Sequence, residues 1–232
     1  MLYNLKYVIF VRQKMTKPIK IETTQKVWIS SDFHYSHKNI CRGTTNWRTA
    51  LDEIPIENTR DFSSVELMNS TIVNNINNCV GQDDILISLG DFSFGGVENI
   101  RKFRERIICK TIYHLYGNHD LNIRKNRDNT QELFAGLFDY LEFEYDKKWF
   151  VLFHYPINSW NGIRKGFIHL FGHQHSLPEN KFRNGKSMDV GIDSHNEFRP
   201  YNINEIILIM NKRPIVVELG DHHGDGIQNK SE

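Results

Sequence analysis

Two histidines separated by one residue, His173 and His175, follow Gly172 and an apolar run over residues 167–171. A glycine after a strand-like run predicts a tight loop, in which two imidazoles at this spacing converge on neighbouring points. Neutral imidazole nitrogen is a common protein ligand for transition metals. The pair alone is a weak signal, because histidines close in sequence also occur by chance on a protein surface. The pair gains meaning from similar groups elsewhere in the chain.

Four other apolar runs end abruptly in side chains that can bind a metal or carry a proton. They are rich in β-branched and aromatic residues, which is typical of buried strands. The runs are 27–31 before Asp32 and His34, 84–89 before Asp91, 111–116 before Asn118, His119 and Asp120, and 149–153 before His154. Each polar residue alone also suits an ordinary role as a helix cap, a turn residue or a core histidine. Together with the histidine pair, they supply enough ligands for two metal ions and a carboxylate that can bridge them.

Helix-like windows separate these runs and predict the architecture. Apolar residues recur at helical spacing in two windows: Val65, Met68, Ile72 and Ile76, and then Ile100, Phe103 and Ile107. Alternating strands and helices predict a layered α/β fold whose ligands bind beyond the carboxyl ends of the strands. Residues 188–193 predict another strand and turn. Residues 205–210 and 214–218 predict a closing hairpin with its turn at 211–213.

The chain has 232 residues, of which 39% are hydrophobic, which is sufficient for one domain with a sizeable core. No internal repeat or low-complexity linker divides it. We expect an extension or an added strand over residues 1–24, the main domain over 25–219 and a flexible tail over 220–232. Met15 is an alternative translation start within the first segment.

Charge and apolar patterning argue against several classes of protein. The net charge is +1, which argues against a long nucleic-acid track. The longest apolar runs, 7–11 and 206–210, are too short to span a bilayer, and the first lacks the cleavage site of a secretory signal. Cys41, Cys79 and Cys109 are widely spaced, which favours reduced thiols over disulfides or a zinc ribbon. We expect a cytoplasmic protein without a membrane partner, and the sequence indicates no oligomeric state.

The polar groups at the five strand ends, taken in order, resemble the motif blocks of the calcineurin-like metallophosphoesterase superfamily. The matching blocks are Asp32-x-His34, Gly90-Asp91, Gly117-Asn118-His119-Asp120, His154 and Gly172-His173-x-His175. They span residues 32 to 175, and the chain resembles the small single-domain members of the family. The resemblance implies an α/β fold, a four-layer sandwich of two mixed β-sheets flanked by helices, with a two-metal centre at the strand ends.

The resemblance also implies a role for each matched residue. One metal ion would be bound by Asp32, His34 and His175, the other by Asn118, His154 and His173, and Asp91 would bridge both. His119 would stand beside the scissile phosphate, with Asp120 holding its imidazole. Such mixed ligands without a thiolate suit Mn²⁺, Fe²⁺, Zn²⁺ or Ni²⁺. The resemblance favours Mn²⁺.

These residue types suit the hydrolysis of a phosphate ester. Two divalent ions about 3.5–4 Å apart lower the pKa of a bridging water to give a hydroxide nucleophile, and they neutralise the phosphoryl oxygens. His119, as an imidazolium, can protonate the leaving group, which contributes roughly 10²–10⁴-fold in rate. We therefore expect a metal-dependent phosphoesterase that acts on a small phosphorylated substrate, with a phosphodiester favoured and a nucleotide among the candidates.

Other functions of the same superfamily stay open. A phosphomonoesterase would use the same centre, and so would a nuclease or a protein phosphatase. Nuclease members usually carry extra domains, and the near-zero net charge of this chain does not favour them. A non-catalytic binding scaffold is less expected, because His119 and all seven ligand candidates are present.

A polar segment after the Asp32 loop is where substrate selection is expected. It contains Arg42, Trp47 and Arg48. Arginine can clamp a phosphate bidentately, and an indole can stack on a base. An ordinary surface loop with Trp47 folded onto the body of the protein is an equally good interpretation. His37, in the same segment, is expected to be a surface residue.

Overall fold

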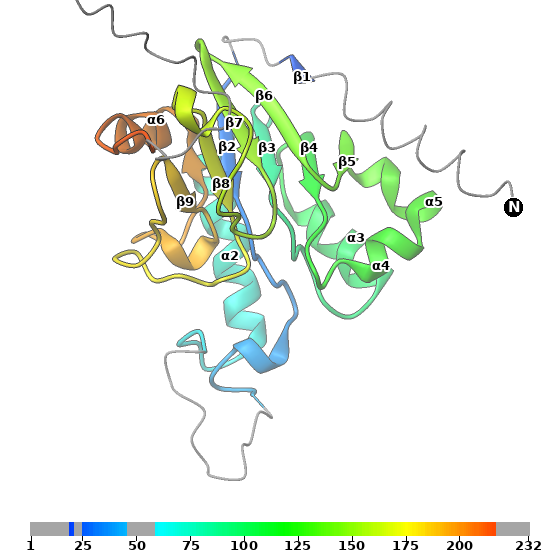
Figure 1. Ribbon diagram of the computed structural model, residues 1–232. Helices are drawn as coiled ribbons and strands as arrows, with labels where there is room; N and C mark the ends of the chain where they lie inside the picture. The colour runs from blue at the N-terminus through cyan, green and yellow to red at the C-terminus, as the bar shows by residue number, and fades with distance from the viewer. Residues whose placement is uncertain (1–18, 21–24, 46–58, 217–232) are drawn as a thin grey trace, which may run out of the picture.

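The computed structural model describes residues 19–20, 25–45 and 59–216 (Figure 1). Trp47 and Arg48, two of the residues expected near the substrate, lie outside these ranges. The expected tail over 220–232 and most of the expected N-terminal segment lie outside them as well. Within the described ranges, no helix combines the length and the apolar character needed to cross a membrane.

The described residues form two mixed five-stranded sheets. The first has the order β10-β2-β3-β4-β5, in which β10 is antiparallel and the other strands are parallel. Its strands are β2 (Val27–Ser30), β3 (Ile85–Ser88), β4 (Thr111–Leu115), β5 (Gly136–Phe138) and β10 (Tyr201–Asn202). The parallel strands β2, β3 and β4 therefore end at the same edge of this sheet.

The second sheet has the order β1-β6-β7-β8-β9, with β6 and β7 antiparallel and the other neighbours parallel. Its strands are β1 (Ile19–Lys20), β6 (Leu141–Tyr145), β7 (Lys148–Leu152), β8 (Ile168–Phe171) and β9 (Ser187–Asp189). β1 lies in the segment expected to be an extension or an added strand, and it pairs with β6. The two mixed sheets expected from the sequence are confirmed.

A buried apolar core joins the facing sides of the two sheets. Alternate residues of the first sheet, such as Val27 and Ile87, share this core with Phe143, Phe150 and Leu170 of the second. Burial of every second residue follows from the period of a strand, which sends successive side chains to opposite faces. The other face of the first sheet is thereby left for the helices.

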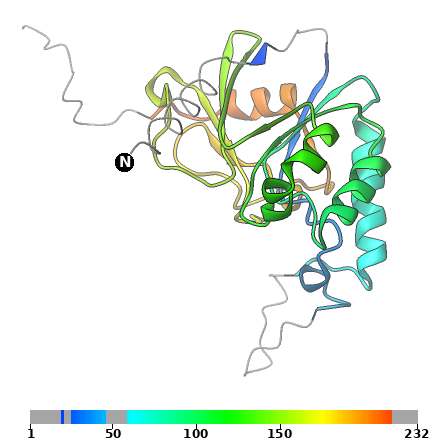
Figure 2. The ribbon, with the colours of Figure 1, turned by 90° about the vertical axis from the view of Figure 1, so that its right-hand side faces the viewer.

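The helices α2, α3, α4 and α5 lie on one side of the molecule (Figures 1 and 2). They are α2 (Val65–Cys79), α3 (Val97–Arg106), α4 (Leu121–Lys125) and α5 (Arg127–Thr130), with the 3₁₀ turns η1 (Lys38–Ile40), η3 (Gln131–Leu133), η4 (Ile163–Lys165) and η5 (Ile192–Ser194). A second apolar core packs α2 and α3 against Leu86 and Ile112 of the first sheet. The Ser64 side chain caps α2 by accepting a hydrogen bond from the Leu67 amide at 3.1 Å. Both helical windows of the sequence are confirmed.

The closing hairpin expected near the C-terminus is wrong, because its first half is the helix α6 (Ile203–Asn211). The β-branched run over 206–209 suggested a strand. Asn202 and Glu205 instead form a capping box that starts a helix, and the buried residues Ile203, Ile206, Ile207 and Met210 follow helical spacing. The second half of the expected hairpin runs into residues that the structure does not describe.

Candidate functional site

The seven expected metal ligands all lie in loops directly after strands. Asp32 and His34 follow β2, Asp91 follows β3 and Asn118 follows β4. His154 follows β7, and the pair His173 and His175 follows β8. The ends of these strands from the two sheets converge, so residues up to 141 positions apart come into hydrogen-bond contact, as the His173 amide and Asp32 Oδ2 do at 2.8 Å.

The first group of side chains contains Asp32, His34 and His175. Asp32 Oδ1 lies 3.8 Å from His34 Nε2 and 3.8 Å from His175 Nε2. One ligand atom of each residue lies within 4.8 Å of the others, so a single ion can contact all three. Asp32 and His34 are almost completely buried, whereas His175 is about one-third exposed.

The second group contains Asn118, His154 and His173. Asn118 Oδ1 lies 2.8 Å from His154 Nε2 and 2.9 Å from His173 Nδ1. The other ring nitrogen of His154, Nδ1, donates to the Leu89 carbonyl oxygen at 2.7 Å, which orients its Nε2 toward the group. His173 and Asn118 are exposed, so this group faces solvent more than the first does.

Asp91 lies between the two groups. Its Oδ2 is 3.5 Å from His34 Nε2 and 3.6 Å from His154 Nε2. Its Oδ1 accepts a hydrogen bond from the His119 amide at 2.8 Å. Asp32 and Asp91 also group with His154, so the two sets of ligand atoms adjoin each other. A carboxylate in this position can contact an ion on each side.

Buried polar atoms in this region have no hydrogen-bond partner among the described residues. They are Asp32 Oδ1 and both ring nitrogens of His34. Burial together with the negative charges of Asp32 and Asp120 raises the pKa of Asp91 to about 8. A bound cation relieves both conditions, because it contacts the buried atoms and offsets the crowded negative charge. Mixed carboxylate, carboxamide and imidazole donors also fit a divalent transition metal.

Unusual backbone geometry aims these side chains. Asp32, His34, Asp91, His173 and His175 all have positive φ angles, between 47° and 70°. A left-handed conformation costs a non-glycine residue roughly 1–2 kcal/mol, so the surrounding loops must hold it in place. Such strain concentrates at functional sites.

Two glycines leave room for the carboxylates. A Cβ atom on Gly117 would overlap Asp91 Oδ1, and one on Gly172 would overlap Asp32 Oδ2. The glycines that precede Asn118 and His173 are therefore required by close packing, in addition to their place in the turns.

His119 lies next to the ligand groups without taking part in either. Its ring centroid is 5.4 Å from that of His34, and the ring is exposed. Partial burial lowers the pKa of His119, and the negative charge of Asp120 opposes this shift without reversing it. An imidazole in this position can donate or accept a proton at a group bound beside it.

The expectation that Asp120 holds the His119 imidazole is wrong. Asp120 is buried, and its carboxylate accepts hydrogen bonds from the amides of Asp91, Phe92 and Gly117 at 2.7–3.0 Å. It also pairs with His114 Nε2 at 3.1 Å. Among the described residues, no hydrogen bond joins it to the His119 ring. Asp120 instead ties the Asp91 loop to the Asn118 loop.

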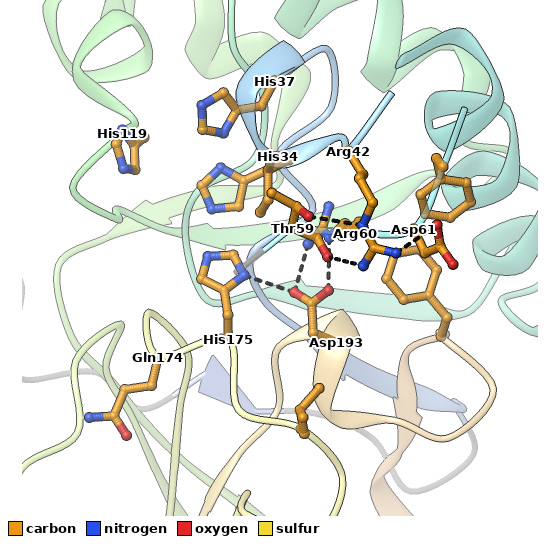
Figure 3. Close-up of a pocket in the computed structure, with 14 residues that line it drawn as sticks. His34, His37, Arg42, Thr59, Arg60, Asp61, His119, Gln174, His175 and Asp193 are labelled. Carbon is orange, nitrogen blue, oxygen red and sulfur yellow. Dashed lines mark hydrogen bonds and ion pairs between the residues drawn. The ribbon is translucent and has the colours of Figure 1, made fainter. Parts of the chain in front are cut away.

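Sequence reasoning missed a buried ion pair behind His175. The Asp193 carboxylate accepts a hydrogen bond from His175 Nδ1 at 2.8 Å and binds Arg60 on its other side (Figure 3). Burial opposes the positive charge of His175, but the Asp193 hydrogen bond and the charge of Asp32 outweigh it and raise the pKa of His175 to about 9. Arg60 also donates to the backbone carbonyls of Asp32 and Phe33.

A pocket of about 950 Å³ opens beside the first group, and His34, His119 and His175 line it (Figure 3). His37, expected at the surface, is half-buried and lines the pocket as well. Its ring stacks on Phe94 with centroids 3.6 Å apart, and burial lowers its pKa to about 3. Arg42, expected near the substrate, also lines the pocket, where its guanidinium contacts Asp61 and Thr59.

Comparison with known proteins finds one similar curated protein and several solved structures with a similar fold, while no family model matches the chain. An uncharacterized protein of Methanocaldococcus jannaschii is 29% identical over 201 residues, which cover 85% of this chain and 98% of the relative. A crystal structure of a protein of unknown function from Aquifex aeolicus is 19% identical, with a TM-score of 0.57, and the match covers 80% of this chain and 99% of that one. An archaeal phosphodiesterase gives a looser match, with 20% identity, a TM-score of 0.41 and coverage of 72% and 84%.

The chain has the fold that its resemblance to the calcineurin-like metallophosphoesterases predicts. The Aquifex protein shares this fold over nearly its whole length. The five motif blocks occupy the loops at which the strands converge, in the order that the resemblance requires.

Proposed function

We propose that this protein is a metal-dependent phosphoesterase that hydrolyses a phosphoester bond of a small phosphorylated substrate, with a phosphodiester favoured over a monoester. The observation that carries the proposal is the position of Asp91, whose Oδ2 lies 3.5 Å from His34 and 3.6 Å from His154. A buried carboxylate between two groups of oxygen and nitrogen donors can bridge a pair of cations.

The residues that would hold the ions divide between the two groups. The first set is Asp32, His34 and His175, the second is Asn118, His154 and His173, and Asp91 is common to both. When bound, two divalent ions supply a nucleophile at neutral pH and offset the charge of the phosphoryl oxygens. The donor types are compatible with Mn²⁺, Fe²⁺, Zn²⁺ or Ni²⁺, and we propose Mn²⁺ as the first to test.

His119 would protonate the oxygen of the leaving group. Three features support this role. The ring of His119 is exposed, it lines the pocket beside the first group, and His119 belongs to neither ligand group among the described residues. Its backbone amide donates a hydrogen bond to Asp91 Oδ1, which holds this part of the loop beside the ligand groups. Proton transfer from a positioned histidine contributes roughly 10²–10⁴-fold in rate.

The test combines metal analysis with hydrolysis of two chromogenic esters. The purified protein is analysed for bound metal, supplemented with Mn²⁺, and assayed with p-nitrophenyl phosphate and bis-p-nitrophenyl phosphate. We expect two metal ions per chain and turnover of the diester. Asp91→Asn is the matched control, because it keeps the shape of the side chain and removes the bridging charge, so it should lose both metal and activity.

The same experiment decides between this function and the alternatives. Cleavage of the monoester alone would indicate a phosphomonoesterase. Two bound metals without cleavage of either compound would contradict a general phosphodiesterase and favour a non-catalytic scaffold. Absence of metal after Mn²⁺ loading would overturn the proposal as a whole.

A further inference from the structure

The pocket beside the first ligand group is the place where the rest of a substrate would lie. Its volume of about 950 Å³ is within the range of sites that enclose small organic ligands. His34, His175 and His119 form one side of it, so its occupant would adjoin the reacting phosphate (Figure 3). If the proposed function holds, the lining of this pocket selects the class of substrate.

Each of the two arginines of the pocket wall is paired with a carboxylate. The described lining residues include two arginines, Arg42 and Arg60, and two aspartates, Asp61 and Asp193. Arg60 is 5% exposed and directs its guanidinium to Asp193 and to two backbone carbonyls, so its donors point away from the pocket space. Arg42 contacts the Asp61 carboxylate at 2.9 Å and also Thr59. A second phosphate in this pocket would therefore meet arginines that are already paired.

One part of the described wall is apolar and partly aromatic. Phe62 and Phe198 have ring centroids 5.7 Å apart, and Ile40 and Leu177 complete this side of the pocket. Leu177 is 45% exposed, so its side chain has apolar surface that an occupant can cover. Covering such surface is favourable at about 25 cal/mol per Å², and aromatic side chains favour flat partners.

We propose that this pocket binds the organic part of a substrate that carries a single phosphate, and that this part is an uncharged group with an apolar, flat face. A nucleoside with one phosphate has this chemistry, and so does an aryl phosphate. A second phosphate is disfavoured because its charge would lose water, while both arginines among the described lining residues are already paired.

Binding of four simple phosphates to the Mn²⁺-loaded protein tests the proposal. Calorimetry measures the affinities of methyl phosphate, phenyl phosphate, thymidine 5′-phosphate and thymidine 3′,5′-bisphosphate. Phenyl phosphate should bind about tenfold or more tightly than methyl phosphate, because its ring covers apolar surface. The bisphosphate should bind about tenfold more weakly than the 5′-monophosphate, from which it differs only by the second phosphate. Equal affinities, or the reverse order, in either pair would overturn the proposal.

Two substitutions at exposed positions connect these affinities to the pocket. Leu177→Ala should weaken phenyl phosphate binding and leave methyl phosphate binding unchanged. Leu208→Ala is its control, because Leu208 is 66% exposed on α6 and does not line the pocket. Asp61 is 83% exposed, so Asp61→Asn removes one lining charge without disturbing the core. This substitution should reduce the difference in affinity between thymidine 5′-phosphate and thymidine 3′,5′-bisphosphate. Unchanged affinity ratios in both variants would place the organic group elsewhere.

The outcomes separate this inference from the proposed function. Relative affinity and ester cleavage are separate measurements, so each can fail without the other. A protein that loads metal and cleaves the diester without discriminating among the four phosphates would retain the proposed function and lose the inference. A protein that loads no metal would lose both.

Discussion

Arg60 holds both carboxylate oxygens of Asp193, through Nε and Nη2, at N···O distances of 2.8 Å. The pair is buried, with the Arg60 side chain 5% exposed and the Asp193 side chain 13% exposed. Because Asp193 also accepts the hydrogen bond from His175 Nδ1, the pair fixes which nitrogen of His175 faces Asp32. An ion pair whose two members are 133 residues apart in the sequence thus orients an expected metal ligand.

Asp193→Asn is expected to weaken metal binding at the group formed by Asp32, His34 and His175. The loss should be about 10–100-fold, which is typical when the partner behind a ligating histidine is removed. The other group should be little affected, because His154 is oriented by the Leu89 carbonyl. Titration with Mn²⁺, followed by calorimetry or electron paramagnetic resonance, measures both sites. Asp83→Asn is the control on an exposed carboxylate, and equal affinities in the two variants would contradict the role of Asp193.

Arg60→Met is expected to destabilise the fold, because it leaves Asp193 buried without its positive partner. Removing one member of a buried pair costs roughly 3–5 kcal/mol. Lys110→Met breaks the exposed pair of Lys110 with Asp83 and should cost at most about 1 kcal/mol. Urea unfolding of the metal-free proteins compares the two variants. A similar small loss in both would show that the Arg60 pair contributes little.

His119→Ala is expected to keep its metal and lose turnover. The loss should increase as the leaving group becomes a poorer one, because such groups depend most on proton donation, and it should reach roughly 10²–10⁴-fold. A series of aryl phosphodiesters with increasing phenol pKa measures this dependence, and metal analysis serves as its internal control. A variant that no longer binds metal would identify His119 as a ligand.

Asp120 is expected to make the stability of the metal-free protein depend on pH. Burial opposes its charge, but the charge of His114 and the hydrogen bonds from His114, Gly117 and Phe92 outweigh burial and lower its pKa from 3.8 to about 2. Because this pKa is lower in the folded state, the stabilisation is present above about pH 4 and is lost as the pH falls toward 2. Each pKa unit corresponds to about 1.4 kcal/mol, so the contribution is ~2 kcal/mol. The difference in unfolding free energy between wild type and Asp120→Asn should shrink as the pH falls from about 4 to 2. A difference that stays constant with pH would argue against this role of Asp120.

Metal removal is expected to lower the melting temperature. The unpartnered atoms of Asp32 and His34 would regain a partner when an ion binds, so binding stabilises the folded state. A free metal concentration of 100 times the dissociation constant adds about 2.7 kcal/mol to the free energy of unfolding. Thermal unfolding with EDTA and then with excess Mn²⁺ measures the effect. The melting temperature of Asp91→Asn should change little between EDTA and Mn²⁺. A wild-type protein whose melting temperature also stays the same would argue against a metal site.

Local patterns in the sequence predicted most of the fold and the position of the seven ligand candidates directly after strands. Apolar runs followed by Asp32, Asp91 and His154 are strands whose ends carry these residues, because a buried strand requires continuous apolar side chains. Since the carboxyl ends of parallel strands lie along one sheet edge, the convergence of Asp32 and Asp91 also followed from the pattern, whereas His154 follows β7 of the second sheet. The error at α6 arose because β-branched residues outweighed the Asn202 and Glu205 capping signal, which was present in the sequence.

Tertiary structure decided the partners of these residues. The sequence alone did not show that Arg60 meets Asp193, because contacts over this distance depend on how the two sheets pack. It also did not show that His37 stacks on Phe94 inside the pocket, or that backbone amides and His114 take up the Asp120 carboxylate. Side-chain chemistry and strand periodicity are local properties that a sequence contains, whereas hydrogen-bond partners and burial depend on the packing of segments distant in the chain.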